Sequence, residues 1–368
     1  MIRIAVLFLA AGLAALPAFA LEENDGVVSL FDDMPEVKKA ASSDKASAAE
    51  DDNGIFSFLN IGGPKKAPLP TTDKQGRENE VLQAIALAEK GNLEAQLALG
   101  YLYLYGGEGI EVDREKAFKY YSMAALQNDP TALNNLGSLY YSGIGVSRDR
   151  MKAAKLFEQA VKLDNTEAAL NLGFMYITGN GVARNDHAAM DLFTKAAQAG
   201  NPTGQFMLGY AYYKGFIVPQ DYKRAAELLR AAADKKFDEA EYIMAQLYLN
   251  GQGITQNYGQ AVRLLNRAAD QGNTAAMMLL AGILSEGEKY AKDWRTAHIL
   301  YNIAAVNGIP AAAARREELA SKLKIEQLLD AQAAAERFKA KPSELTDYVH
   351  KTFGNPIYGY IDGTNQLQ

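Results

Sequence analysis

The stretch Asp129–Lys162 reads DPTALNNLGSLYYSGIGVSRDRMKAAKLFEQAVK, and versions of it recur along the middle of the chain at a step of 36 residues. Two alanines seven positions apart mark the second half of each version, with a leucine or an aromatic residue between them. This spacing is typical of one face of a helix. Because alanine is small, we expect another helix to approach closely there. The alanine positions are Ala117, Ala153, Ala189, Ala225, Ala261 and Ala297, then Ala124, Ala160, Ala196, Ala232, Ala268 and Ala304.

The first half of each version predicts a second helix. A glycine or alanine is followed three positions later by a tyrosine or leucine, as in Gly137 and Tyr140. An Asn or Asp stands at the start of this half in most versions, where such residues cap helices; Phe237 breaks this column, with Asp238 available one step later. A glycine-containing element then separates the two halves, and glycine suits the left-handed residue that ends a helix. Each version is therefore expected to form a helical hairpin.

Stacking decides the fold class. One such hairpin cannot bury its apolar stripes alone, whereas six stacked hairpins share a continuous core. We therefore predict an all-α fold, a solenoid of six helix–turn–helix repeats over residues 92–308. The segment 76–91 is expected to be an N-terminal capping helix, because its apolar residues follow the helical period. Residues 309–340 are expected to form C-terminal capping helices.

The repeated residues match a known pattern. Ala-x-x-x-Leu-Gly-x-x-Tyr-x-x-Gly-x-Gly-Val, followed by Asp-x-x-x-Ala-x-x-Leu-Phe-x-x-Ala, as in Ala132 to Ala160, resembles the Sel-one-like repeat (SLR) family, which is related to the tetratricopeptide repeats. The resemblance covers residues 92–308 and implies a right-handed α/α superhelix that serves as a scaffold for protein–protein contact. The departures are local: Ala245 and Ala281 replace the helix glycine, and Ile217 and Lys289 replace the second loop glycine.

The N-terminus predicts export. Residues 1–20 contain Arg3, an apolar run and Ala18-Phe19-Ala20, as in a signal peptide cleaved after Ala20. The run is shorter than the ~20 residues that span a bilayer, so no membrane span is expected after cleavage. We predict a periplasmic protein, with secretion beyond the cell as an alternative.

Two further segments flank the repeats. Residues 21–75 form an acidic lead whose composition predicts flexibility. Its apolar island at 54–61 is either a docking motif, for a partner or for the chain's own groove, or a chance cluster in a linker. Residues 341–368 contain aromatic residues among glycines, and are either a partner-binding tail or an extension packed on the last helices.

Composition argues against several classes of protein. The chain has 38 basic and 44 acidic residues and no basic block, which disfavours a nucleic-acid partner. It has no cysteine and only three histidines, His187, His298 and His350, which are not in a metal-binding motif. We therefore expect no metal and no cofactor. The cysteine-rich branch of the SLR family pins its repeats with disulfides, so activities of that branch are not transferred to this chain.

Catalytic motifs are also missing from the sequence. Neither a Gly-x-Ser-x-Gly elbow nor a Walker-type phosphate loop occurs. Ser321–Lys324 matches Ser-x-x-Lys, but the companion Ser-Asp-Asn and Lys-Thr-Gly elements are absent. We expect no catalytic residues and a protein that is not an enzyme.

The resemblance also indicates a binding face. In the tetratricopeptide register, positions between the packed Leu-Gly-x-x-Tyr residues point into a concave groove. In this chain those positions vary from repeat to repeat and carry aromatic residues, which are frequent at interface hot spots. The candidate partner contacts are Tyr101, Tyr141, Phe174, Phe206, Tyr210, Tyr213 and Tyr242. The alternative for each is packing between repeats.

These features together predict a non-enzymatic scaffold of the bacterial envelope that binds a protein or peptide segment. It would act as a regulator of envelope signalling or as an assembly factor. The alternatives from other classes are an envelope hydrolase acting on β-lactam or peptidoglycan substrates, suggested by the cysteine-rich SLR branch and Ser321, and a secreted host-interacting factor.

Overall fold

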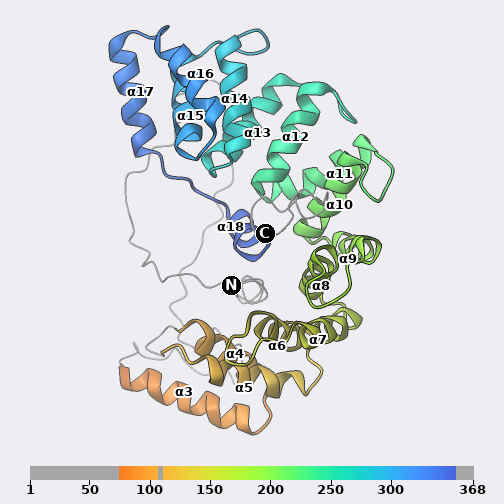
Figure 1. Ribbon diagram of the computed structural model, residues 1–368. Coiled ribbons are helices and arrows are strands. Elements are labelled where there is room, and N and C mark those ends of the chain that lie inside the picture. The colour runs from red at the N-terminus through yellow and green to blue at the C-terminus, as the bar shows by residue number, and fades with distance from the viewer. Residues whose placement is uncertain (1–73, 107–110, 354–368) are drawn as a thin grey trace, which may run out of the picture. The chain divides into compact units, whose positions relative to one another are not determined.

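The computed structural model describes residues 74–106 and 111–353, and this part of the chain contains sixteen helices and no strand (Figure 1). The prediction of an all-α repeat fold is confirmed. The predictions for the signal peptide, for the lead up to residue 73 with its apolar island, and for residues 354–368 lie outside the described residues. The described chain divides into two compact units at Asn201 and Pro202, with the second unit ending at Val349 within the last helix.

The first unit contains three hairpins and the helix that precedes them. Consecutive helices contact each other, so each hairpin covers the apolar face of the one before it. The first helix of each hairpin is termed the A helix and the second the B helix. The helices are α3 (Lys74–Glu89), α4 (Leu93–Tyr105), α5 (Arg114–Ala125), α6 (Pro130–Ser142), α7 (Arg150–Lys162), α8 (Thr166–Thr178) and α9 (Asp186–Gln198).

The second unit contains three more hairpins, and α16 and α17 both pack against α15. The sixth hairpin, α14–α15, has the same helix lengths as the preceding two. The helices are α10 (Pro202–Lys214), α11 (Tyr222–Asp234), α12 (Asp238–Asn250), α13 (Tyr258–Asp270), α14 (Thr274–Glu286), α15 (Trp294–Val306), α16 (Pro310–Ala320), α17 (Ile325–Arg337) and α18 (Glu344–Phe353).

Side-chain caps fix where most repeat helices begin. Asp129 accepts a hydrogen bond of 2.7 Å from the Ala132 backbone N–H, and Asp149 accepts one of 2.9 Å from Lys152. Each bond satisfies a backbone donor that has no partner inside the helix. Equivalent caps are made by Asn92, Asp113, Asn165, Asn185, Asp221, Asn257, Asn273 and Asp293.

The helix α12 departs from this pattern. Phe237 occupies the cap position and makes no side-chain cap, and Asp238 is the first helical residue rather than a substitute cap. The sequence had offered Asp238 for that role.

In the A helices α4, α6, α8 and α10, a glycine accommodates a bulky residue of the following B helix. A Cβ atom on Gly137 would lie 2.8 Å from the Phe157 ring, and one on Gly173 would lie 2.6 Å from the Phe193 ring. Both rings are buried. The A and B helices can therefore approach closely because glycine has no side chain at the crossing point.

The second glycine of the loop serves contact between hairpins as well as the turn. A Cβ atom on Gly145 would collide with the backbone of Arg114 at the start of the preceding B helix. Gly253 stands in the same relation to Tyr222 in the second unit. Ile217 replaces this glycine and still adopts a φ of 64°, a conformation that is unfavourable for a β-branched residue.

Candidate partner-binding surface

The predicted contact residues all lie on A helices, as the register required. They vary in how much of each side chain the repeats cover. Tyr101 lies on α4, Tyr141 on α6, Phe174 on α8, Phe206, Tyr210 and Tyr213 on α10, and Tyr242 on α12.

Three of these side chains are buried. Phe174 is 8% exposed and its ring centre lies 5.3 Å from that of Phe193. Phe206 is 0% exposed, packs edge-on against Phe237 at 4.7 Å, and stacks with Tyr210, which is 4% exposed. Their burial matches the packing alternative, so they offer little area to a partner in the described structure.

The half-buried residues Tyr213 and Tyr242 form a polar and aromatic cluster in the second unit. The Tyr213 hydroxyl donates to Gln246 Oε1 at 3.1 Å, and Gln246 Nε2 donates to the Tyr242 hydroxyl at 2.9 Å. Burial raises the pKa of both phenols, so they remain protonated. The three residues, here the Tyr213–Gln246–Tyr242 cluster, join α10 to α12.

The bridging role of Gln246 was not predicted from the sequence. A single amide can both accept and donate, which is what two facing phenols require. The two hydrogen bonds hold the rings in place before any partner arrives.

In the first unit an amide pair joins neighbouring A helices. Asn171 Nδ2 on α8 donates to Asn134 Oδ1 on α6 at 2.9 Å. Asn134 is buried. A buried amide needs such a partner to offset its lost hydration. The pair therefore belongs to the packing between repeats.

Tyr101 and Tyr141 are the half-buried candidates of this unit. The ring centre of Tyr101 lies 4.9 Å from that of Tyr105 on the same helix. The Arg150 guanidinium lies 5.5 Å from the centre of the Tyr141 ring and donates to Asn180 Oδ1 at 3.2 Å. A cation over an aromatic face is attracted to it, so Tyr141 adjoins a positively charged surface.

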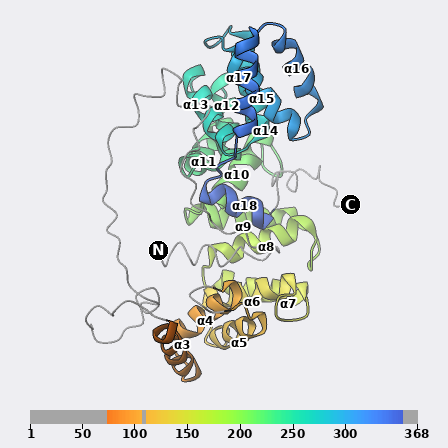
Figure 2. The ribbon, with the colours of Figure 1, turned by 90° about the vertical axis from the view of Figure 1, so that its left-hand side faces the viewer.

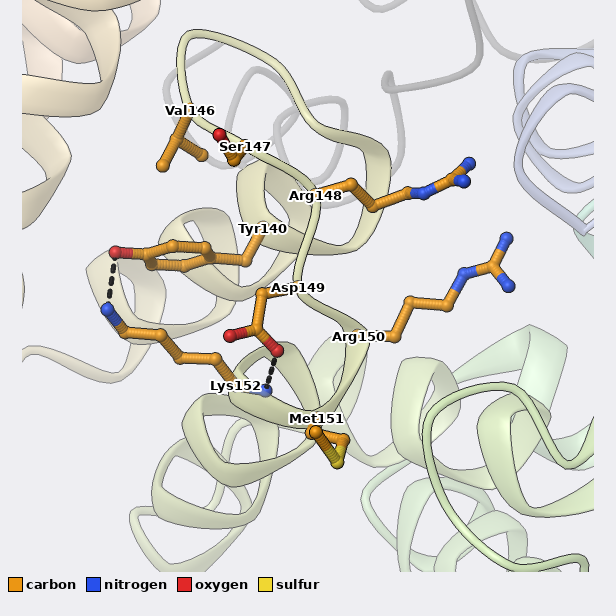
Figure 3. Close-up of a pocket in the computed structure, with 8 residues that line it drawn as sticks. All are labelled: Tyr140, Val146, Ser147, Arg148, Asp149, Arg150, Met151 and Lys152. Atoms are coloured by element: carbon orange, nitrogen blue, oxygen red, sulfur yellow. Dashed lines mark hydrogen bonds between the residues drawn. The ribbon is translucent and has the colours of Figure 1, made fainter.

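That surface belongs to an open pocket of about 540 Å³ at the loop between α6 and α7, in which Arg148 and Arg150 extend to the same side (Figure 3). Lys152 Nζ donates to the Tyr140 hydroxyl at 2.6 Å. The carboxylate of Asp149 caps α7. The pocket is thus lined by three cationic side chains and one carboxylate. Its lining residues are Tyr140, Val146, Ser147, Arg148, Asp149, Arg150, Met151 and Lys152.

Ser321, the nucleophile of the hydrolase alternative, stands at the end of α16. Its hydroxyl donates to the backbone carbonyl of Glu318 at 2.7 Å, and Lys322 Nζ donates to Glu318 Oε1 at 2.7 Å. The two contacts are local to one helix end. They differ from the arrangement in which a nucleophile donates to a neighbouring general base.

Within the described ranges, no helix combines the length and the apolar character that crossing a bilayer requires.

The comparison with protein families matches the repeat region. The Sel1 repeat model matches residues 93–129, 130–165, 166–201, 202–237 and 238–273, which are five consecutive copies. Each matched copy begins with an A helix and contains the following B helix. The hairpin α14–α15 continues the same spacing after the last matched copy. No curated protein matches this sequence.

Two solved structures share the fold. A Sel1 repeat protein from Oxalobacter formigenes is 29% identical with a TM-score of 0.53, over 62% of this chain and 99% of that chain. A protective antigen of uropathogenic Escherichia coli that displays an SLR fold is 24% identical with a TM-score of 0.51, over 80% of this chain and 67% of that chain. The repeated hairpins, their matched sequence pattern and these shared folds agree, and the chain belongs to the Sel1 repeat family.

Proposed function

We propose that the protein is an exported, non-enzymatic scaffold that holds a protein or peptide segment against the A-helix face of its repeats. Sel1 repeat proteins are generally protein-interaction scaffolds, which supports the class of function. The observation that carries the choice of face is the Tyr213–Gln246–Tyr242 cluster, which is half-buried and already ordered.

The cluster suits recognition of a peptide for two reasons. Tyrosine contributes a large apolar ring and a hydroxyl, and it is common among residues that dominate binding energy. Because Gln246 holds both rings, little side-chain freedom remains to be lost when a partner binds. The expected ligand is a segment with an apolar side chain to cover the rings and a polar group to reach a phenol oxygen.

The first unit carries a positively charged surface that could also contact a partner. Its open pocket carries Arg148, Arg150 and Lys152 beside Tyr141, in a chain whose overall charge is negative. A partner segment that also reached this surface would need acidic side chains there. Such complementarity contributes mainly to specificity and to the rate of association.

The alanine variant of the cluster tests the choice of face. Tyr213→Ala/Tyr242→Ala should lower capture of the partner from an envelope fraction by about tenfold, because two contact rings are lost. Arg263→Ala on the exposed side of the B helix α13 is the control and should leave capture unchanged. Unchanged capture by a double variant with wild-type helical content would refute this placement.

The proposed location is the periplasm, on the strength of the signal-peptide pattern in residues 1–20. There the protein would regulate envelope signalling or assist assembly, through the same binding face. Cell fractionation with N-terminal sequencing tests the location. A mature chain beginning at Leu21 in the periplasmic fraction is expected, and a cytoplasmic chain that retains Met1 would contradict the proposal.

A further inference from the structure

The uncapped helix α12 receives its cap from a distant part of the chain. Phe237, whose side chain has no oxygen that could cap the helix, is 0% exposed and packs against Phe206. The first backbone N–H of the helix, that of Asp238, instead donates to Thr346 Oγ1 on α18 at 3.1 Å, across 108 residues of sequence. The missing Asn or Asp in the cap column thus coincides with the place where α18 binds.

Several other hydrogen bonds attach the start of α18 to the same place. Ser343 Oγ donates to the Lys236 carbonyl at 2.5 Å, and the Ser343 backbone N–H donates to Gln271 Oε1 at 2.9 Å. Thr346 Oγ1 lies 2.7 Å from the same Gln271 oxygen. Just before the helix, the Lys341 N–H donates to the Asp270 carbonyl at 2.8 Å. These contacts reach two inter-repeat loops, the one before α12 and the one before α14.

Other residues of the repeats hold the side chains that bind the tail in position. Gln271 Nε2 donates to Glu241 Oε2 at 2.9 Å, which directs the amide oxygen toward the tail. Glu241 is completely buried, and its carboxyl group contacts the Arg267 guanidinium. Asn273 Nδ2 donates to Asp238 Oδ2 at 3.0 Å and joins the two loops. The acceptor for the tail is therefore built by the repeats themselves.

One sequence-based alternative packed residues 341–368 on the last helices, and within the described part of this segment Lys341, Ser343 and Thr346 bond to the loops before α12 and α14. An extended stretch after α17 leads away from α16 and α17 to α18 (Figure 1 and Figure 2). Within the described tail, Thr346 and Val349 are buried. The tail returns to the fifth repeat instead of extending the end of the stack.

We propose that the loops at Lys236 and Gln271, with the first turn of α12, form a docking site for the first turn of a helix that begins Ser-x-x-Thr, and that residues 341–349 of this chain occupy it as a detachable latch. The site is termed the tail-docking site. Its occupant is recognised by hydroxyl and backbone groups, which a helix start displays in a fixed geometry. The inference goes beyond the proposed scaffold function and does not depend on the identity of the partner.

The chemistry of the contact favours exchange over permanent packing. Hydrogen bonds of Ser343 and Thr346 attach the tail, and the net contribution of each is modest because it replaces a bond to water. Val349 adds one fully buried apolar side chain to these contacts. The short connection from α17 supplies a high effective concentration that keeps the site filled. A competing helix of the same type can therefore displace the tail.

A labelled peptide with the sequence of residues 339–353 tests the site in the full-length protein. The wild-type chain should bind it weakly, because its own tail competes. The Ser343→Ala/Thr346→Val variant removes both hydroxyls and should bind the peptide about tenfold more tightly in fluorescence anisotropy. Adding Gln271→Leu to that variant should abolish the gain, because the acceptor is then lost.

The matched control exchanges the same residue types elsewhere in the second unit. Ser285→Ala/Thr274→Val changes a hydroxyl that bonds within its own helix and one near a neighbouring loop. This control should bind the peptide as weakly as the wild type.

Hydrogen exchange measured by mass spectrometry gives an independent readout. In the tail variant, backbone amides of 341–349 and of the first turn of α12 should exchange about tenfold faster than in the wild type, while α14 stays unchanged. Unchanged protection of the tail, or a released tail without a gain in peptide binding, would overturn the proposal. Protection that depends on protein concentration, with a dimer in sedimentation, would assign the site to a second copy and overturn the latch within one chain.

Discussion

The hairpin α6–α7 of the first unit and the hairpin α12–α13 of the second are two versions of one repeat with different construction. The first begins with Asp129 as a cap and has Gly137 beneath Phe157. The second begins with Phe237, has Ala245 at the glycine position, and starts its A helix with buried acids. The first repeat satisfies its own backbone, whereas the second depends on the tail.

Departures from the repeat pattern can therefore mark the places where another segment of the chain attaches. Phe237 gives up a capping oxygen and gains a buried ring. The acids Asp238 and Glu241 are buried only because Asn273, Arg267 and Gln271 provide them with partners. In the fifth repeat, the departures from the pattern thus serve contacts that the regular repeats do not make.

The substitution Phe237→Asn, which restores the repeat pattern, should have the largest effect on the free energy of unfolding. Phe237→Asn supplies a cap worth about 1 kcal/mol but removes a buried ring worth about 3–5 kcal/mol. We expect a net loss of about 3 kcal/mol in the free energy of unfolding, measured by urea denaturation. The control Asn165→Ala in a regular repeat should cost about 1 kcal/mol. A stabilised Phe237→Asn variant would show that the ring has no packing role.

The buried acid of the fifth repeat should give the protein a distinctive pH dependence. Burial raises the pKa of Glu241 from 4.5 to about 7, and this effect exceeds the opposing effects of Arg267 and Gln271. Between these pH values the folded state keeps a proton that the unfolded state releases. The free energy of unfolding should therefore fall as pH rises from 4.5 to 7.

Glu241→Gln removes this proton exchange. The wild type should lose about 2 kcal/mol across that pH window, and the variant should lose much less. Thermal or urea denaturation at several pH values measures the slope. A wild-type stability that rises through this window, with a variant that follows the same curve, would show that Glu241 is ionised in the folded protein.

The helix glycines of the regular repeats should show a smaller, steric effect on stability. Gly173→Ala places a Cβ atom against the buried Phe193 ring and should cost about 1 kcal/mol or more, even though alanine favours helices. Gly259→Ala is the matched control in α13, where the nearest atom to the new Cβ would lie 3.5 Å away. It should be neutral or stabilise by up to about 1 kcal/mol. Equal effects of the two changes would remove the steric explanation for the glycine column.

The fold was predictable because its determinants are local and repeated. Caps such as Asp129 act within three residues, and glycines such as Gly143 act within one turn. The period of 36 residues then dictates stacking. The contact of Phe157 with Gly137 was not predicted, since it joins two helices.

The candidate site was less predictable because burial depends on distant neighbours. Phe206 and Tyr213 lie on one helix and look alike in sequence, but Phe237 covers the first and Gln246 bridges the second. The docking of Thr346 on Asp238 joins residues 108 positions apart, and no local pattern encodes it. The only available signal was the broken cap at Phe237.

Site-specific photocrosslinking in intact cells tests whether the A-helix face binds a protein partner. A photoreactive amino acid at position 213 samples this face, and one at position 263 samples the exposed side of α13. One discrete crosslinked product is expected from position 213 and none from position 263. Discrete products from position 263 alone, or the same products from both positions, would contradict binding at this face.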